Sequence, residues 1–177
     1  MGININIYNG FLFQVAWFAC VLGGTQVAVF AAPLAIWLHL RYVSGDYYEL
    51  ALLLQVALLG LLVDSGFIYL GVLTGPEVQF LPPLWLTLLW PLFATTLCYC
   101  MEWFQKRPWA AVPAGALAGP GSYYAGVQLS DISFGLPVVT SLAIIALVWA
   151  VVFPLCLWLA VRHEQGGRSR AATRQRA

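Results

Sequence analysis

Apolar stretches alternate with short polar segments along this chain, and six of the stretches approach the length of a membrane span. Crossing about 30 Å of hydrocarbon takes about 20 apolar residues in a helix that rises about 1.5 Å per residue. The six stretches cover residues 7–23, 26–40, 50–73, 84–104, 109–129 and 136–161. The pattern predicts an all-α fold, an integral membrane bundle of about six transmembrane helices within residues 1–161. The opening segment lacks the basic start of a secretory signal, so we expect it to remain as the first span.

Together, the first two stretches are too long for one straight span and barely long enough for two. Gly23 and Gly24 lie between them and offer a turn, which favours a helical hairpin. The basic residues support this division. Arg41 follows the second stretch, Lys106 and Arg107 follow the fourth, and the other five Lys and Arg residues follow the sixth. If the chain has six spans, all eight Lys and Arg residues lie on one side of the membrane. The positive-inside bias identifies that side as the cytoplasm, and both termini are then cytoplasmic.

The composition agrees with a lipid environment. Hydrophobic residues make up 62% of the chain, charged residues make up 8%, and the mean hydropathy is +0.83. Soluble domains carry about 25% charged residues because a surface that faces water needs them. The lipid bilayer is therefore the main partner that the sequence predicts.

Residues 162–177 differ from the rest of the chain because they are polar and rich in arginine. We expect this cytoplasmic tail to be disordered, to anchor the topology and to attract anionic lipid. Binding of nucleic acid is not expected, since the tail has no aromatic or folded support for it.

Cysteine and histidine positions give no metal site. All four cysteines lie in apolar stretches, and Cys98 and Cys100 would point to nearly opposite sides of a helix. We interpret them as small core residues. His39 and His163 lie near the cytoplasmic boundary without companion ligands, which is typical of interfacial residues. Without a catalytic triad, a phosphate-binding loop or an HExxH motif, neither a metal nor a cofactor is expected.

Asp64 is a single carboxylate near the middle of the third stretch. An ionised aspartate at a helix centre costs about 2.5–3.5 kcal/mol on insertion, so we expect it to face the bundle or a water-filled cavity. Gly60 and Gly71 lie on the same helical stripe and favour close helix packing there. Two interpretations remain open: a buried hydrogen-bond brace between helices, or a site for a proton, a substrate or a lipid headgroup.

Other polar residues match Asp64 in depth. Gln14 lies near the middle of the first stretch, and Thr95 and Thr96 lie near the middle of the fourth. We predict that these four residues form one polar layer at the membrane midplane. Pro91 is expected to kink the fourth stretch.

Glu102, near the cytoplasmic end of the fourth stretch, is a secondary candidate. Lys106 lies four residues later, so an ion pair along the helix accounts for it, and a site that opens toward the cytoplasm is the alternative. Trp17, Trp90 and Trp149 lie deeper than the other tryptophans, where an indole N–H needs a partner or a cavity.

The fifth stretch combines small residues with prolines. Small residues spaced by four form one face: Ala111, Gly115 and Gly119. Such a face serves internal packing or self-association, so the oligomeric state stays open. Pro113 and Pro120 predict either a broken helix that lines a cavity or a close-packing helix with kinks. Tyr123 follows the second proline, and its hydroxyl is a candidate to point inward.

Four blocks occur in order at these depths: FQVAWFACVLGG, LLGLLVDS, PPLWLTLLWPLFATTL and AGPGSYYAG. Together they resemble a bacterial family of small inner-membrane proteins catalogued as a domain of unknown function (domain of unknown function 2878), up to the arginine-rich tail. The resemblance implies a multi-pass protein of the bacterial inner membrane with a lipid-linked role. It maps family positions onto this chain as follows: Trp17, Asp64, Thr95, Thr96, Gly119 and Pro120. Where the family has a polar Asn-His-Ser stretch this chain has Cys98, Tyr99 and Cys100, which argues against a catalytic role there.

Three classes of function follow. The leading hypothesis is a non-enzymatic accessory in membrane lipid or fatty-acid modification, with lipid-modifying membrane enzymes as partners. A transporter of small molecules or lipids would use Asp64 as a protonatable group. A lipid-modifying enzyme would use Asp64 or Glu102 as an acid or base.

Overall fold

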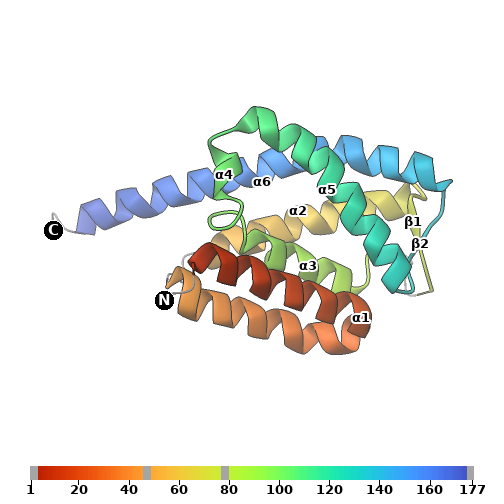
Figure 1. Cartoon of the computed structure of the whole chain (residues 1–177), viewed down its shortest axis with the longest axis horizontal. Helices are drawn as coiled ribbons and strands as arrows, with labels where there is room; N and C mark the ends of the chain where they lie inside the picture. The colour runs from red at the N-terminus through yellow and green to blue at the C-terminus, as the bar shows by residue number, and fades with distance from the viewer. Residues whose placement is uncertain (1–3, 46–48, 77–79, 175–177) are drawn as a thin grey trace.

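The computed structural model describes residues 4–45, 49–76 and 80–174, with side chains described as far as residue 166. All long elements are helical, as the sequence predicts. They are α1 (Ile5–His39), the π-helical turn η1 (Leu40–Ser44), α2 (Leu50–Tyr69), α3 (Leu84–Ala94), α4 (Glu102–Gln105), α5 (Pro108–Leu129) and α6 (Val138–Arg174). Figure 1 shows the start of α1 and the end of α6 at one end of the bundle, and two short strands at the other.

Helix α1 is a helical hairpin. Gly24 has φ 58° and ψ −160°, a backbone conformation that glycine adopts without the steric cost of a side chain. The two limbs on either side of it run back along one another (Figure 1). The turn that the sequence placed at this glycine pair is therefore confirmed.

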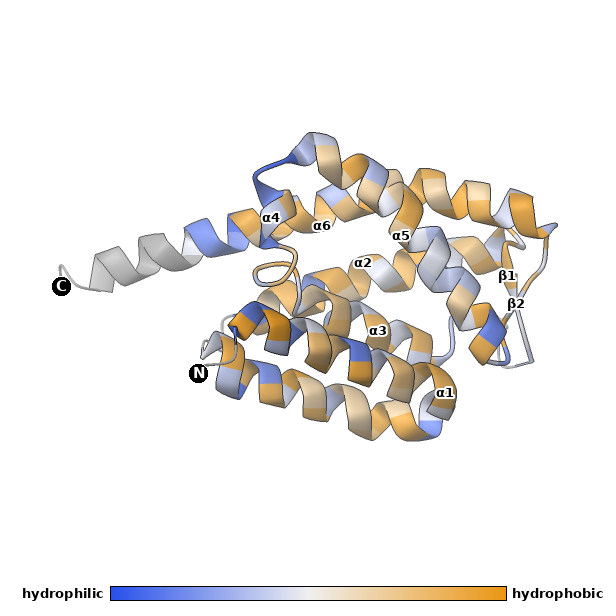
Figure 2. Cartoon of the chain, viewed as in Figure 1, coloured by the Kyte–Doolittle hydropathy of each residue, from blue (hydrophilic) through white to orange (hydrophobic). Residues whose placement is uncertain are grey.

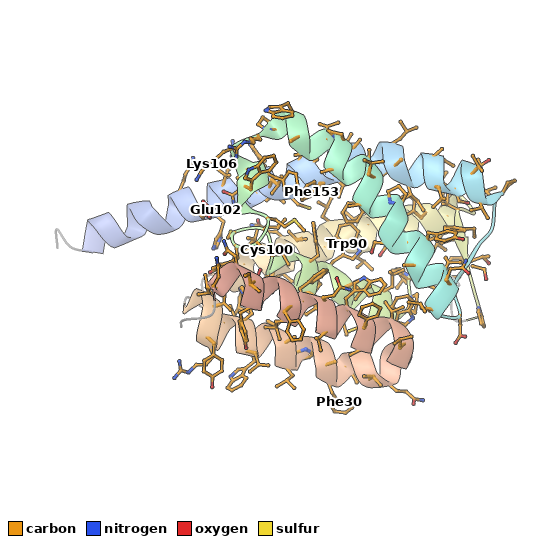
Figure 3. All side chains as sticks on the ribbon, viewed as in Figure 1. Phe30, Trp90, Cys100, Glu102, Lys106 and Phe153 are labelled. Carbon is orange, nitrogen blue, oxygen red and sulfur yellow. The ribbon has the colours of Figure 1, made fainter. Side chains whose placement is uncertain are left out.

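Three helices are long and apolar enough, by length and composition, to cross a membrane within the described part of the chain. They are Ile5–Ser44, which contains both limbs of the hairpin, Leu50–Tyr69 and Val138–Gly166. Large apolar side chains such as Phe11, Phe30 and Leu62 are exposed. Figure 2 shows hydrophobic residues along the helices, and Figure 3 shows Phe30 at the outer edge of the bundle. An outer surface of this kind is compatible with lipid and indicates a membrane protein.

The fourth apolar stretch is only partly a helix, which differs from the prediction. Helix α3 continues past Pro91 and ends at Ala94, and residues 95–101 then form consecutive turns before α4. The hydroxyls of Thr95 and Thr96 donate to the carbonyls of Leu92 and Phe93, each at 2.6 Å. These local bonds compete with the helical pattern, so the chain leaves the helix at the threonine pair rather than at the proline.

Helix α5 is continuous through Pro113 and Pro120, and it packs closely on α6. A Cβ atom added at Gly115 would lie 2.3 Å from the carbonyl oxygen of Trp149, so only glycine allows this approach. The small-residue face therefore serves internal packing, and of the two interpretations of this stretch the structure favours the close-packing helix.

Two short loops pair at the end of the bundle opposite the start of α1. Strand β1 (Leu73–Thr74) follows α2, strand β2 (Ser133–Phe134) follows α5, and the two are antiparallel. Gly71 has φ 69° and lies beyond the end of α2. It was expected to serve helix packing, but the structure places it in the turn into β1, where a left-handed backbone favours glycine.

Helix α6 continues across the boundary that the sequence set at residue 161. It extends to Arg174, and the division into a membrane domain and an arginine-rich tail stays a prediction. Several residue types in this stretch, Arg, Ala, Glu and Gln, have high helix propensity, whereas Gly166 and Gly167 do not.

Candidate functional site

Asp64 is fully buried at 0% exposure and connects three helices. From α3, the Trp90 indole Nε1–H donates to one carboxylate oxygen at 2.8 Å. From α5, the Tyr123 hydroxyl donates to the other oxygen. Both oxygens thus accept a hydrogen bond from a buried side chain, which is how a buried acid avoids an unpaired polar atom. The arrangement corresponds to the buried brace that was one of the two interpretations of Asp64.

Glycines create the room for the two indole rings of this cluster. A Cβ added at Gly60, one turn before Asp64, would lie 1.9 Å from the Trp90 ring, so the indole lies directly on the α2 backbone. The Trp90 and Trp149 rings stack with centroids 5.3 Å apart and an interplanar angle of 19°. Trp149 in turn lies against Gly119, where an added Cβ would be 2.2 Å from its ring. The small residues on α2 and α5 therefore position the aromatic residues around Asp64.

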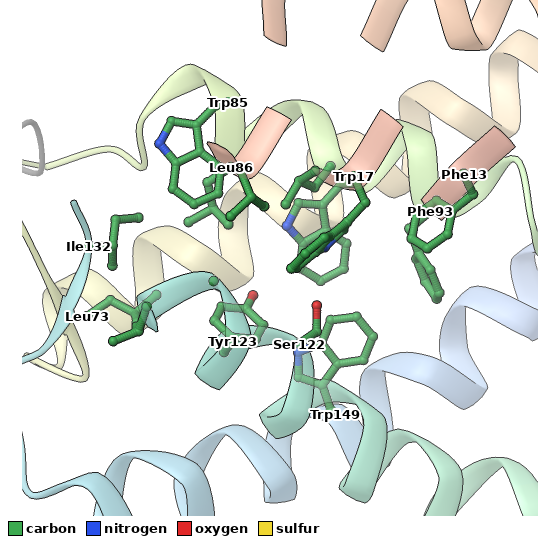
Figure 4. Close-up of a pocket in the computed structure, with 15 residues that line it drawn as sticks. Phe13, Trp17, Leu73, Trp85, Leu86, Phe93, Ser122, Tyr123, Ile132 and Trp149 are labelled. Atoms are coloured by element: carbon green, nitrogen blue, oxygen red, sulfur yellow. The ribbon is translucent and has the colours of Figure 1, made fainter. Parts of the chain in front are cut away.

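An apolar cavity of about 80 Å³ lies beside this cluster, between the α1 and α3 side and the α5 and α6 side (Figure 4). Aromatic side chains make up much of its wall: Phe13, Trp17, Trp85, Trp90, Phe93, Tyr123 and Trp149. Ser122 also lines the cavity and is itself exposed, so the cavity reaches the surface of the bundle at α5. Such a wall binds an apolar group by dispersion and by exclusion of solvent.

The predicted polar layer at the midplane does not assemble. Gln14 is exposed on the first limb of α1, and the hydroxyls of Thr95 and Thr96 bond to carbonyls of their own segment. The prediction grouped these residues by position along each stretch and took no account of the direction in which each side chain points. Asp64 instead pairs with Trp90 and Tyr123.

The secondary candidates divide between two places. Trp17 and Tyr123 both lie in the cavity wall. Glu102 lies on α4, where it accepts a hydrogen bond from Lys106 at 3.0 Å, the i,i+4 pair that the spacing predicts. Both side chains of this pair are largely exposed, and Figure 3 shows them well away from Trp90.

A second buried polar network lies near the end of the bundle where α1 begins, and the sequence did not predict it. His39 is 0% exposed, which corrects its expected place at the interface. Its ring nitrogens lie 3.2 Å from Asn9 Nδ2 and 3.1 Å from Glu49 Oε1, and the Tyr99 hydroxyl donates to Glu49 at 3.4 Å. Asn9 and His39 are equally far from Gly24 in the sequence. A hairpin that turns at Gly24 therefore brings them side by side, so this pair could have been predicted.

The same network holds the irregular segment that follows α3. Asn9 Nδ2 donates to the carbonyl of Thr95 at 3.0 Å, and the Cys100 backbone N–H approaches Asn9 Oδ1 at 3.5 Å. Backbone groups outside a helix need such partners when they are buried. The network therefore has a structural role, and within the described residues no three His, Cys, Asp or Glu side chains gather as metal ligands would.

The sequence profile of a family of proteins of unknown function, DUF2878, matches residues 6–155 of the chain. This protein belongs to the DUF2878 family. The match confirms the resemblance drawn from the four sequence blocks. Neither a curated protein nor a solved structure matches the chain. Within the DUF2878 region lie the hairpin, Asp64 and its two donors, and the whole wall of the apolar cavity, whereas the arginine-rich end of α6 lies outside it.

Proposed function

We propose that this protein is a multi-pass protein of the bacterial inner membrane that takes up part of an apolar lipid chain in the cavity beside Asp64. In this proposal it acts as a non-enzymatic accessory to enzymes that modify membrane lipids or fatty acids. The observation that carries the proposal is the aromatic wall of the cavity, to which two helices of membrane-spanning length, α1 and α6, contribute.

The size and lining of the cavity favour the end of a chain over a whole lipid. A cavity of about 150 Å³ with an apolar lining stays dry and binds benzene, whereas the space here is about 80 Å³. A few methylene groups therefore fit inside, and the remainder of the lipid would lie outside this cavity. Each buried methylene contributes about 0.8 kcal/mol when it leaves water, and less when it leaves lipid.

The contacts of Asp64 favour this function over transport and over catalysis. A transporter that used Asp64 as a proton carrier, or an enzyme that used it as an acid or base, would need that group to reach a substrate. Both of its oxygens instead accept bonds from Trp90 and Tyr123 inside the bundle. Glu102, the other acid considered, is paired with Lys106.

Photolabelling tests whether a chain enters the cavity. A phospholipid with a diazirine near the end of its acyl chain, added to the purified full-length protein in detergent, is expected to label peptides that line the cavity. Replacing Gly126 with leucine should abolish most of this labelling. Gly126 is buried in the cavity wall and an added Cβ meets no atom within 4 Å, so the leucine would fill the cavity without disturbing the backbone.

The matched control is Gly121→Leu. Gly121 lies on the same helix, is exposed, and also has open space around an added Cβ. This variant should keep the labelling pattern of the wild type. Labels confined to the outer surface in all three proteins would contradict the proposal.

The topology in this proposal has the start of α1 and the end of α6 on the cytoplasmic side. Exposed tryptophans with neighbouring arginines lie at that end, with Arg107 4.3 Å from the Trp103 ring and Arg162 4.0 Å from the Trp158 ring. Such pairs are common where a helix meets a membrane surface. Reporter fusions at Gly45 and Gln165 are expected to report cytoplasm, and fusions at Glu77 and Asp131 periplasm. A periplasmic result at Gln165 together with a cytoplasmic result at Gly45 would exclude an even number of spans between them.

A further inference from the structure

A second cavity, of about 190 Å³, lies at the end of the bundle where the strands pair, opposite the start of α1. Its lining comes from the hairpin turn, the loops that follow α2 and α5, and the start of α3. The wall includes Thr25, Gln26, Gly75, Pro76, Pro83 and Asp131. We call it the polar chamber, because hydroxyl, amide, carboxylate and backbone groups make up much of its wall, whereas aromatic rings line much of the first cavity.

The two cavities share part of their walls. Trp85 and Ile132 line both the polar chamber and the apolar cavity. Trp85 is 6% exposed, so its ring is a partition between the two spaces rather than a surface residue. A phospholipid combines an apolar part and a polar part, so it suits two adjoining cavities of these two kinds.

The charge of the polar chamber has one sign. Asp131 supplies a carboxylate, and among the described lining residues there is no Lys, Arg or His. The sequence offers no nearby cation either, since no Lys or Arg occurs at positions 1–40, 42–105 or 108–161. An anionic headgroup would meet a carboxylate with no cation to balance it, whereas an ammonium group would pair with that carboxylate.

We propose that the polar chamber holds the headgroup of the lipid whose chain enters the apolar cavity, and that it selects an ammonium-bearing, zwitterionic phospholipid. This inference rests on the proposed function. The ammonium group pairs with Asp131, and the Thr25 hydroxyl and the Gln26 amide supply donors for the phosphate oxygens. Because Asp131 is exposed, the selection amounts to that of one exposed ion pair, about two- to fivefold in affinity.

The test compares two photoreactive phospholipids that share one diazirine-bearing acyl chain and differ in carrying an ethanolamine or a glycerol headgroup. The purified full-length protein in detergent is expected to be labelled in the apolar cavity about two- to fivefold more by the ethanolamine lipid. Asp131→Asn should bring the ratio close to one while keeping the labelling of cavity peptides. Glu102→Gln is the matched control, because it removes an exposed acid on α4 and should leave the ratio unchanged.

The outcomes separate this inference from the proposed function. Equal labelling of the cavity by both lipids, or a preference for the glycerol headgroup, would overturn the headgroup selection and leave chain binding intact. The same holds if Asp131→Asn keeps the ethanolamine preference. Failure of both lipids to label the cavity would instead overturn the proposed function and this inference with it.

Discussion

Replacing Asp64 with alanine is expected to lower the free energy of unfolding by about 2–6 kcal/mol, since each buried donor left without an acceptor costs about 1–3 kcal/mol. The donors are the Trp90 indole N–H and the Tyr123 hydroxyl, which belong to two different helices and share this one acid. For a chain of this length the melting temperature should fall by an amount on the order of 10 °C. Thermal unfolding of the detergent-purified protein, followed by size-exclusion chromatography, measures the change.

The Asp64→Asn variant distinguishes a structural hydrogen-bond brace from a proton-transport site at this position. Asp64→Asn keeps an oxygen that accepts one of the two bonds, so the brace predicts a smaller loss of stability than Asp64→Ala. A proton-coupled transporter predicts a normally folded Asp64→Asn protein without flux. Gln14→Leu is the control, because this exposed amide lies outside the cluster and its loss should change stability by less than about 0.5 kcal/mol. If the Asp64→Ala variant were as stable as the wild type, the hydrogen-bond brace would be excluded.

A single methyl group on Gly115 is expected to destabilise the pairing of α5 and α6. The added Cβ would lie 2.3 Å from the Trp149 carbonyl oxygen and 2.8 Å from the Phe153 Cβ, so the helices must separate to admit it. Overpacking of this kind costs about 1–3 kcal/mol, and more when backbone atoms must move. Because Trp149 also stacks on Trp90, the shift reaches the Asp64 cluster. The expected fall in melting temperature of Gly115→Ala is about 5 °C or more.

Gly121→Ala gives the comparison for this prediction. It adds the same methyl group to the same helix, in a place where nothing lies within 4 Å. Alanine has a higher helix propensity than glycine, so stability should be unchanged or slightly higher. If the two alanine variants melted at the same temperature, the close approach of α5 to α6 would be excluded.

The helices and the hairpin could be predicted because they depend on patterns that run along the chain. Apolar length sets the spans, and a glycine pair marks the turn at Gly24. The irregular segment after α3 was harder to predict. It arises because the hydroxyl hydrogen bonds of Thr95 and Thr96 compete with the backbone bonds of a helix. A hydropathy pattern carries no information about such a competition.

The candidate site was predictable only in part. Asp64 was visible as the one acid at mid-depth, and Gly60 marked the face on which it packs. Its partners were not predicted, because a polar layer chosen by depth ignores the direction of each side chain around its helix. Gln14 is exposed on α1, whereas Trp90 and Tyr123 had been considered for other reasons.

The network around His39 was missed for a related reason. A histidine near a predicted boundary is usually interfacial, and its neighbours in sequence gave no polar partner. The partners come from elsewhere in the chain: Asn9 on the other limb of the hairpin, and Glu49 beyond η1. Contacts of this kind depend on how the helices are arranged, which a single sequence specifies only indirectly.

The claim that an apolar chain enters the bundle beside Asp64 is tested most directly by crystals grown in a lipid mesophase that contains a phospholipid brominated near the end of its acyl chain. The account predicts an anomalous bromine peak inside the cavity, between Trp17, Tyr123 and Trp149 (Figure 4). Bromine confined to the outer surface of the helices, with the cavity closed by side chains or filled only by ordered water, would contradict it.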